Sequence, residues 1–226
     1  MADRYARNRN LIDSREQEIL RGKTIAVVGL GGLGSYIAEQ LARLGFGRLI
    51  LIDGDIVDES NLNRQLFATE RAIGLPKADL AVERLCQVNS QVEYISHHAR
   101  LTPENGIELL EGADIVVDAV DSISARLMLQ DLCGQLRVPL VHGAIGGWWG
   151  QVSVIFPGDD TLSRIYPKEY VLGIEQDFGN PAFTPGIIAS IQVSETLKIC
   201  LGRPGVLRGK LLRVDLLEHE YFIIEL

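Results

Sequence analysis

The feature that most constrains this chain is a glycine-rich turn that follows an apolar run. Residues 25–34 read Ile-Ala-Val-Val-Gly-Leu-Gly-Gly-Leu-Gly, and a second apolar run, residues 49–52, is followed by Asp53. A buried strand, a glycine turn, a helix and a second strand that ends in a carboxylate form a nucleotide-binding unit. We therefore expect a phosphate at the start of the helix and a ribose hydrogen-bonded to Asp53. A glycine turn without a ligand is the alternative, and the spacing disfavours it.

The four glycines have separate predicted tasks. Gly29 takes the tight turn that ends the strand, and Gly34 lets the helix pack close to the sheet. Gly31 has no Cβ, so phosphate oxygens can approach the backbone there. Gly32 continues the same predicted phosphate loop.

Charged residues after the second strand separate a triphosphate site from a dehydrogenase site. Asp55 is followed by Asn-Leu-Asn-Arg-Gln at 61–65, and Lys77 lies thirteen residues past Arg64. A triphosphate that is attacked at its α-phosphorus needs several cations, because charge spreads over the transferred group. We expect Arg64 and Lys77 to supply this charge.

A third apolar run, residues 115–120, contains Asp118 and is followed by Asp121. A parallel strand here would deliver Asp121 to the ligand crevice at its carboxyl end. Proteins hold Mg²⁺ through few carboxylates and leave the rest of its shell to phosphate and water. The sequence therefore predicts Asp121 as a Mg²⁺ ligand.

At these residues the chain resembles the ubiquitin-activating-enzyme-like adenylyltransferases, which include the molybdopterin-synthase adenylyltransferases and the sulfur-carrier adenylyltransferases of thiamine biosynthesis. The matching segments are Arg-Tyr-Ala-Arg at 4–7, Gly-Leu-Gly-Gly-Leu-Gly at 29–34, Asp-Gly-Asp at 53–55, Asn-Leu-Asn-Arg-Gln at 61–65, Gly-Leu-Pro-Lys at 74–77, Asp-Ala-Val-Asp at 118–121 and Gly-Gln-Val-Ser-Val at 150–154. They stand in the family's order along nearly the whole chain. Each segment alone is weak evidence, whereas the combination is highly specific.

The resemblance implies an enzyme that uses ATP and Mg²⁺ to adenylate the C-terminal carboxylate of a small ubiquitin-like sulfur-carrier protein ending in Gly-Gly. Pyrophosphate would be released. The resemblance also implies roles for individual residues. Asp53 would bind the ribose, Arg64 and Lys77 the phosphates, and Asp121 the Mg²⁺, and Arg7 would reach into the ATP site of the partner subunit of a homodimer. The matched motifs add Asp55 and Asn61 to the expected ATP-binding residues.

The chain departs from this family where zinc is expected. Many members carry two Cys-x-x-Cys pairs, which together make a four-ligand zinc site. The first pair would follow residues 150–158, but residues 159–166 read Asp-Asp-Thr-Leu-Ser-Arg-Ile-Tyr, and the last residues hold no second pair. Residues 173–184, where the family's sulfur- or thioester-forming cysteine would stand, also contain no cysteine. We therefore predict no structural zinc and no covalent transfer to an enzyme thiol.

Composition narrows the setting. No apolar run approaches the roughly 20 residues of a membrane span, and the N-terminus lacks the apolar stretch of a secretory signal. Cys86, Cys133 and Cys200 are widely spaced and imply no disulfide framework, so we expect a cytoplasmic protein. Their helical surroundings predict small buried side chains. The formal charge of −8 disfavours general nucleic-acid binding.

Helical and strand patterns alternate to about residue 142. This predicts an α/β fold with a Rossmann-like doubly wound sheet, parallel in its N-terminal part and antiparallel in its C-terminal part. The expected helices are 13–22 (capped by Asp13 or Ser14), 76–88, 103–110 and one that begins near Gly186; the further expected strands are 92–96, 138–141, 151–156 and a hairpin over 211–224. We expect a single adenylating domain over 1–226, with an N-terminal arm and helix (1–22), a nucleotide-binding part (23–142), and a carrier-binding and dimer part (143–226) that contains a crossover loop (157–181).

Three other functions stay open. A related enzyme adenylates a carboxylate on a modified tRNA nucleoside with the same chemistry, and a basic surface beside the ATP site would favour it. A non-catalytic nucleotide-binding module would not need Arg64, Lys77 and Asp121, and a nicotinamide-dependent dehydrogenase would share only the first motif. For His142 we favour a hydrogen-bonded structural role. For Trp148 and Trp149 we favour packing over contact with a carrier tail.

Overall fold

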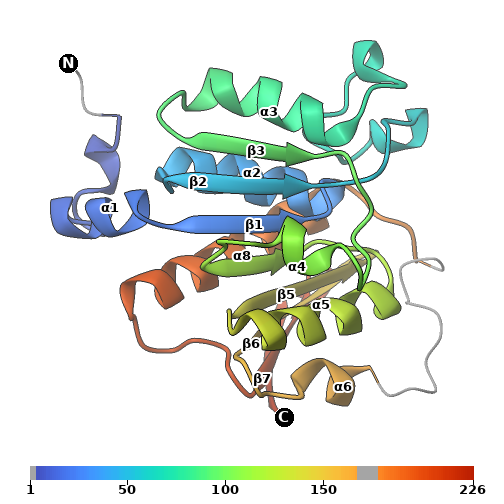
Figure 1. Ribbon diagram of the computed structural model, residues 1–226. Helices are drawn as coiled ribbons and strands as arrows, with labels where there is room; N and C mark the ends of the chain where they lie inside the picture. Colours follow the sequence, from blue (N-terminus) through green and yellow to red (C-terminus); the bar gives the residue numbers. More distant parts are fainter. Residues whose placement is uncertain (1–3, 167–177) are drawn as a thin grey trace.

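The computed structural model describes residues 4–166 and 178–226, which form one eight-stranded sheet with helices on both faces (Figure 1). The strands are β1 (Thr24–Val28), β2 (Arg48–Ile52), β3 (Glu93–His97), β4 (Ile115–Asp118), β5 (Leu140–Gly146), β6 (Trp149–Ile155), β7 (Lys210–Asp215) and β8 (Glu220–Glu225). The α-helices are α1 (Ser14–Arg21), α2 (Gly32–Leu44), α3 (Lys77–Val88), α4 (Gly106–Leu109), α5 (Ile123–Leu136), α6 (Thr161–Ile165) and α8 (Phe183–Leu201). Short 3₁₀ helices are η1 (Ala6–Asn8), η2 (Glu59–Asn61) and η3 (Glu70–Ala72).

The sheet has the strand order β3-β2-β1-β4-β5-β6-β7-β8. The first five strands in this order, from β3 through β2, β1 and β4 to β5, run parallel. The pairs β5–β6, β6–β7 and β7–β8 are antiparallel. The chain first winds from β1 outward to β3 and then returns to place β4 on the other side of β1. The predicted doubly wound sheet, with antiparallel strands in its C-terminal part, is therefore confirmed.

Alternate residues of each central strand point to opposite faces, and each face has its own apolar core. In β1, Ile25 and Val27 belong to the core beneath α2, α3 and α8. Ala26 and Val28 belong to the core beneath α4, α5 and α6. The four consecutive apolar residues of β1, 25–28, follow from this double coverage, because a parallel strand with helices on both faces has no solvent side.

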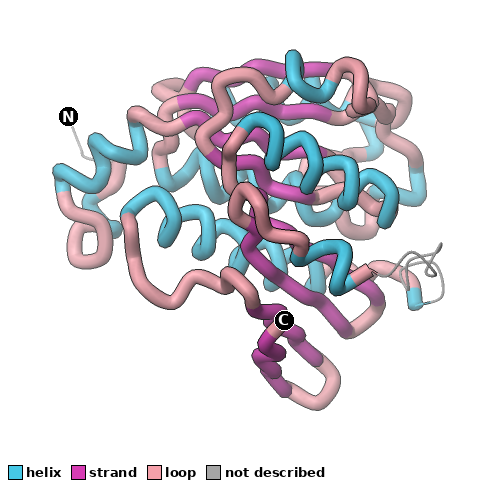
Figure 2. The backbone as a smooth tube through the Cα atoms, turned by 60° about the horizontal axis from the view of Figure 1, so that its bottom comes forward, coloured by secondary structure: helices cyan, strands magenta, loops and turns pink. Residues whose placement is uncertain are grey.

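Local signals in the sequence fix several element ends. The Asp13 carboxylate accepts a hydrogen bond from the Glu16 N–H (2.8 Å), and the Glu16 carboxylate accepts one from the Asp13 N–H (3.0 Å). The predicted cap of α1 is therefore a capping box. Gly45 ends α2 in the left-handed conformation with φ +80°. The C-terminal hairpin turns at His219, whose φ is +59°, and it projects from the body of the molecule in Figure 2.

Several predicted boundaries are wrong. Strand β5 starts two residues later than predicted and runs on to Gly146, because its antiparallel partner β6 continues the pairing. The helix expected over 103–110 is the single turn α4, and the long C-terminal helix begins at Phe183 rather than near Gly186. The predicted crossover loop at 157–181 contains the helix α6, and its residues 167–177 lie outside the described residues.

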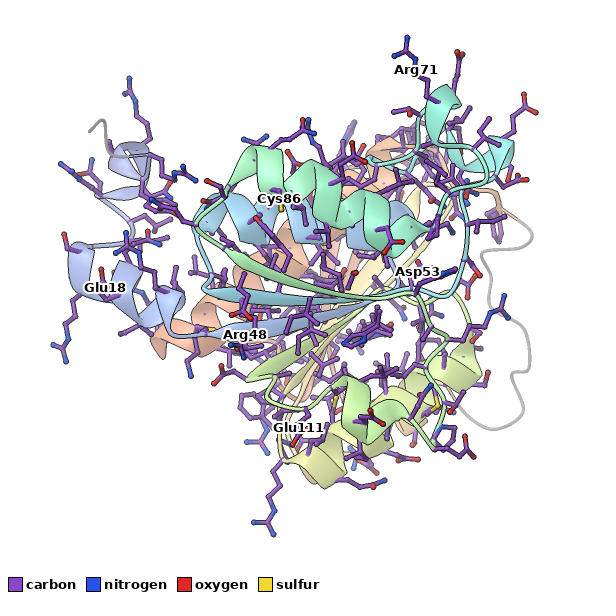
Figure 3. All side chains as sticks on the ribbon, turned by 45° about the horizontal axis from the view of Figure 1, so that its top comes forward. Glu18, Arg48, Asp53, Arg71, Cys86 and Glu111 are labelled. Atoms are coloured by element: carbon purple, nitrogen blue, oxygen red, sulfur yellow. The ribbon has the colours of Figure 1, made fainter. Side chains whose placement is uncertain are left out.

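The prediction that all three cysteines are buried is wrong for Cys86. Cys133 is buried and Cys200 is half-buried, but Cys86 is exposed on α3 (Figure 3). The buried face of α3 includes Ala81 and Leu85. Cys86 follows Leu85 by one residue, which is about 100° around the helix, so its thiol points away from the core.

Within the part of the chain that the structure describes, no helix is both long enough and apolar enough to cross a membrane.

Candidate active site

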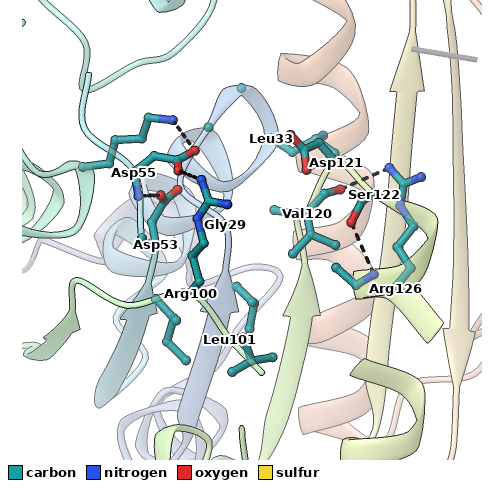
Figure 4. A pocket seen from close by; sticks show the side chains of 18 of the residues that line it. Gly29, Leu33, Asp53, Asp55, Arg100, Leu101, Val120, Asp121, Ser122 and Arg126 are labelled. Atoms are coloured by element: carbon teal, nitrogen blue, oxygen red, sulfur yellow. Dashed lines mark hydrogen bonds and ion pairs between the residues drawn. The ribbon is translucent and has the colours of Figure 1, made fainter. Parts of the chain in front are cut away.

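A cavity of about 800 Å³ opens at the carboxyl ends of β1, β2 and β4 (Figure 4). The winding of the sheet reverses between β1 and β4, which is where open α/β sheets bind ligands. Among the described residues, four cationic and three acidic side chains line it, so this cavity has a small positive excess in a chain of formal charge −8. These residues are Arg64, Lys77, Arg100, Arg126, Asp53, Asp55 and Asp121.

The glycine turn joins β1 to α2 and borders the cavity through Gly31 and Gly32. Gly29 has φ +89°, and a Cβ there would lie 2.5 Å from the Ala119 carbonyl oxygen. A Cβ on Gly34 would lie 1.8 Å from the Gly29 oxygen, so only glycine lets α2 pack this close to the strand. The N-terminus of α2 therefore reaches the cavity, and its partial positive charge favours an anion there.

Asp53 ties the end of β2 to the glycine turn. Its Oδ2 accepts a hydrogen bond from the Leu30 N–H (2.6 Å), and its Oδ1 accepts one from the Asp55 N–H (2.8 Å). Burial raises the pKa of the Asp53 carboxyl, while these two N–H donors and the charge of Lys77 oppose the rise. Each carboxylate oxygen keeps a further lone pair, so Asp53 can also accept a hydrogen bond from a hydroxyl group in the cavity.

Asp55 draws two cations to one edge of the cavity. Its Oδ2 lies 3.5 Å from the Lys77 Nζ, and its Oδ1 accepts a hydrogen bond from the Arg100 Nη2 (3.1 Å), as Figure 4 shows. Lys77 is the first residue of α3, and its side chain is only 10% exposed. Its ammonium group is therefore held at the cavity by the packing of α3.

Arg64 lies just after η2 and packs against the glycine turn. Its Cγ and Cδ lie 3.6 Å from where a Cβ on Gly32 would stand, and its Nη1 donates a hydrogen bond to the Asn63 Oδ1 (2.7 Å). Asn61 is buried, and its Oδ1 accepts a hydrogen bond from the Asp58 N–H (3.1 Å). Arg64 thus brings a cation beside the N-terminus of α2, and Asn61 stabilises the loop that carries it.

Asp121 is exposed at the cavity wall, three residues past the end of β4. The turn before it is fixed by Asp118, whose Oδ1 accepts a hydrogen bond from the Val120 N–H (3.0 Å). Ser122 then caps α5 by accepting a hydrogen bond from the Ala125 N–H (3.3 Å). Both flanks of Asp121 are therefore held while its carboxylate faces the cavity.

A buried network supports this turn. The Asp118 Oδ2 and the His142 Nδ1 lie 2.6 Å apart, and the Tyr166 hydroxyl lies 3.2 Å from the His142 Nε2. The Gln192 Nε2 donates a hydrogen bond to the Asp118 carbonyl oxygen (2.7 Å). His142 is fully buried and outside the cavity lining, which agrees with the structural role favoured from the sequence.

The cavity brings together most of the residues predicted for the site. Those that line it are Gly29, Gly31, Gly32, Asp53, Asp55, Asn61, Arg64, Lys77 and Asp121. Gly34 packs behind the turn instead. Arg7 lies in η1, and the neighbouring Tyr5 contacts Gly45 just past the last residue of α2. The thirteen residues of α2 span about 20 Å, so η1 lies far from the cavity of its own chain.

Sequence reasoning missed six polar residues of the lining, which are Gln65, Arg100, Ser122, Ser124, Arg126 and Asn180. Arg100 carried a usable signal, because it follows the end of β3 by three residues and parallel strands end at the same edge of a sheet. Trp148 and Trp149 lie outside the lining and are about half-exposed. Trp148 packs against Phe183 with the ring centroids 4.6 Å apart.

Comparison with known proteins identifies the family. The sequence pattern of the ThiF family matches residues 5–226. The chain belongs to the ThiF family. Among curated ThiF-like relatives, the adenylyltransferase and sulfurtransferase MOCS3 of Aedes aegypti is 40% identical over 87% of this chain and 46% of its own length. The SAMP-activating enzyme E1 of Haloferax volcanii is 34% identical over 97% of this chain and 83% of its own length.

The chain thus spans about half the length of the MOCS3 relatives it matches. Solved structures with the ThiF-family fold include Escherichia coli MccB with ATP, which superposes with a TM-score of 0.81 at 19% identity and covers 100% of this chain and 72% of that one. The E. coli tRNA N6-threonylcarbamoyladenosine dehydratase, TcdA, superposes with a TM-score of 0.75 at 27% identity and covers 88% of this chain and 95% of that one.

Proposed function

We propose that this chain is an ATP-dependent adenylyltransferase that acts on the C-terminal carboxylate of a small ubiquitin-like sulfur-carrier protein. One observation carries the proposal: the same cavity is lined by a glycine turn, a helix N-terminus, Asp53, Arg64, Lys77 and Asp121. The names of the MOCS3 and SAMP-activating relatives support the same activity. A ThiF-family chain with this donor set is suited to bind a triphosphate and to neutralise charge during its cleavage.

The reaction forms one bond and breaks one. A carboxylate oxygen of the carrier attacks the α-phosphorus of ATP, and the bond between that phosphorus and the α,β-bridging oxygen breaks. Pyrophosphate leaves with the electron pair, and the carrier becomes an acyl-adenylate. Because the carboxylate is already ionised, no general base is needed, and catalysis consists of positioning and charge neutralisation.

Four side chains of the cavity have proposed tasks. Asp53 accepts hydrogen bonds from the ribose, and Arg64 and Lys77 bind phosphate oxygens beside the N-terminus of α2. Asp121 is the exposed carboxylate that would hold Mg²⁺. A single carboxylate fits that ion, because phosphates and water supply its other ligands. Bound there, Mg²⁺ would neutralise charge on the leaving group.

The finer parts of the proposal concern partners and organisation. We infer a carrier that ends in Gly-Gly, as the resemblance to the sulfur-carrier adenylyltransferases implies. We infer a cytoplasmic homodimer, with residues 23–142 binding ATP and residues 143–226 binding the carrier and the second subunit of a single adenylating domain. The absence of structural zinc and of an enzyme-bound sulfur intermediate remains a prediction from the missing cysteines.

One other substrate has a specific observation in its favour. TcdA, named as a tRNA-modifying dehydratase, is 27% identical to this chain and almost fully covered by it. The chemistry at the α-phosphorus would be the same, with a carboxylate on a tRNA nucleoside as nucleophile. The higher identity to MOCS3 favours a carrier protein as the substrate. ATP–pyrophosphate exchange that occurs with tRNA but not with the carrier would reverse that preference.

Isotope exchange between ATP and pyrophosphate tests the function directly. The chain serves as bait to capture a small Gly-Gly-ended protein, and exchange is then measured with that protein and Mg²⁺. We expect exchange in the wild type and a loss of about 100-fold or more in Asp121→Asn, because the variant removes charge that acts in the transition state. Asp131→Asn, a change at an exposed residue of α5 outside the cavity, is the matched control. Exchange in Asp121→Asn at the wild-type rate would reject the role of Asp121, and a wild type without exchange would reject the function.

A further inference from the structure

We propose that Arg100 is a third phosphate-binding cation of the ATP site, held beside Lys77 by the carboxylate of Asp55. This inference rests on the proposed function. Arg100 stands in the loop between β3 and α4, and this loop walls the cavity through residues 99–101 and Pro103. The matched sequence motifs do not include it.

The backbone of Arg100 is fixed by packing. A Cβ on Gly54 would lie 2.7 Å from the Arg100 N and 2.5 Å from its Cγ, so the loop passes directly against the turn that follows β2. The Asn105 Nδ2 donates a hydrogen bond to the Arg100 carbonyl oxygen (3.0 Å), and the Asn105 Oδ1 accepts one from the Thr102 N–H (2.8 Å). The start of the side chain is therefore placed by the fold, close to Asp53 (Figure 4).

The guanidinium group, by contrast, is only lightly held. The Arg100 side chain is 81% exposed, and within the described part of the chain its Nη2 donates one hydrogen bond, of 3.1 Å, to the half-exposed Asp55. Exposed ion pairs of this kind contribute little to stability, since water competes for both partners. A structural role for Arg100 is therefore weakly supported, and the group can exchange Asp55 for another anion at little expense.

The position of Asp55 indicates which anion fits. Its two oxygens lie 3.5 Å from the Lys77 Nζ and 3.1 Å from the Arg100 Nη2. An anionic group in the position of the Asp55 carboxylate contacts both Lys77 and Arg100. A phosphate suits this position, because it presents paired oxygens to an arginine as a carboxylate does. We infer that Asp55 is the positioning residue that keeps Lys77 and Arg100 together until a phosphate of ATP engages them.

Binding measurements on the purified full chain separate this role from a structural one. The dissociation constants of ATP and of adenosine are measured for the wild type, Arg100→Gln, Arg100→Met and Arg100→Lys. Arg100→Met keeps the aliphatic stem that packs on Gly54, so it removes charge without removing that contact. Arg71→Gln is the control, because Arg71 is exposed on η3 and lies outside the cavity lining (Figure 3).

We expect Arg100→Gln and Arg100→Met to weaken ATP binding about 10-fold and adenosine binding less than about 2-fold, because adenosine has no phosphate. Arg100→Lys keeps the charge and should lose about 3-fold, and Arg71→Gln should match the wild type. Equal losses for ATP and adenosine, or no loss for ATP, would overturn the role of Arg100. A wild type that binds no ATP would instead overturn the proposed function, so the two failures are distinguishable.

Discussion

At the scale of single residues, Gly34 leaves no room for a side chain. A Cβ there would lie 1.8 Å from a backbone oxygen, and backbone cannot move aside as the end of a side chain can. We expect Gly34→Ala to lower the free energy of unfolding by about 3 kcal/mol, at the upper end of the usual range for overpacking. Urea denaturation measures this change.

Gly134 provides the matched control for that substitution. It lies in the exposed face of α5, and a Cβ there would have no neighbour within 4 Å. Gly134→Ala should raise the free energy of unfolding by about 0.5–1 kcal/mol, because alanine loses less backbone entropy in a helix. The interpretation of Gly34 fails if both variants change stability in the same direction.

Single residues also mark the limit of sequence reasoning about the site. The glycines and Asp53 were predictable because their tasks follow from the local chain: a turn, a close approach and a strand end. The sequence does not show which residues Arg100 and His142 contact. Their partners, Asp55 and Asp118, are 45 and 24 residues away in the sequence. A lone carboxylate in a buried strand does demand a buried partner, but it does not say which one.

At the scale of elements, the segment that follows β6 has an ion pair where the family's first cysteine pair would stand. The Arg208 Nη2 and Nε donate to the two oxygens of Asp159 (2.7 and 2.9 Å), and the guanidinium lies 4.9 Å from the centre of the Phe156 ring. Arg208 holds the pKa of Asp159 below its ordinary value. This pair joins the end of β6 to the segment that enters β7.

That ion pair predicts a pH-dependent contribution to stability. A carboxyl with a lowered folded-state pKa stabilises the fold above its unfolded value and loses this effect as the pH falls through the folded value. Arg208→Gln should therefore melt about 2 °C below the wild type at pH 7, and the gap should narrow as the pH falls below 3.8, the ordinary pKa of an aspartate. The comparison uses thermal melts with Arg71→Gln as a charge-matched control. A gap that stays constant over this range would contradict the assignment.

Helix α3 shows how a one-residue offset decides chemistry. Cys86 is exposed, whereas burial raises the pKa of Cys133 to about 12 and that of Cys200 to about 12. A thiolate is the reactive form, so iodoacetamide should alkylate Cys86 at least about 10 times faster than the other two cysteines in the folded protein. Peptide mass spectrometry after a timed reaction measures this, with Cys86→Ser as the control. Comparable alkylation of all three in the native state would contradict the burial described above.

At the scale of the whole molecule, the alternation of helix and strand made the parallel half of the sheet predictable, since right-handed crossovers leave few ways to assemble it. The antiparallel half was predictable as a class, but its order was not. Nothing local in β6 specifies that it should lie between β5 and β7, because that order depends on α8 crossing back to the face that α2 covers. The same long-range packing extended β5 beyond its predicted end.

The whole molecule also decides where Arg7 can act. Because η1 packs at the C-terminal end of α2 and the cavity lies at the N-terminal end, Arg7 cannot reach its own site across about 20 Å. If Arg7 serves catalysis at all, a second subunit must supply it, where it would neutralise the leaving pyrophosphate as an arginine finger does. We expect Arg7→Ala to reduce the exchange rate by about 100-fold or more with little change in ATP affinity, because charge is greatest in the transition state.

Mixing two inactive variants tests whether Arg7 acts in the active site of the partner subunit. A heterodimer of Arg7→Ala and Asp121→Ala has one site with an intact Asp121 and an intact Arg7 from the other subunit, and one site with neither. Equal mixing with subunit exchange should therefore restore about a quarter of wild-type activity, since half of the dimers are mixed and each has one working site. Sedimentation measures the dimer, and ATP–pyrophosphate exchange measures the recovery. A monomeric protein, or a mixture that stays inactive after subunit exchange, would show that Arg7 does not complete the site of a partner.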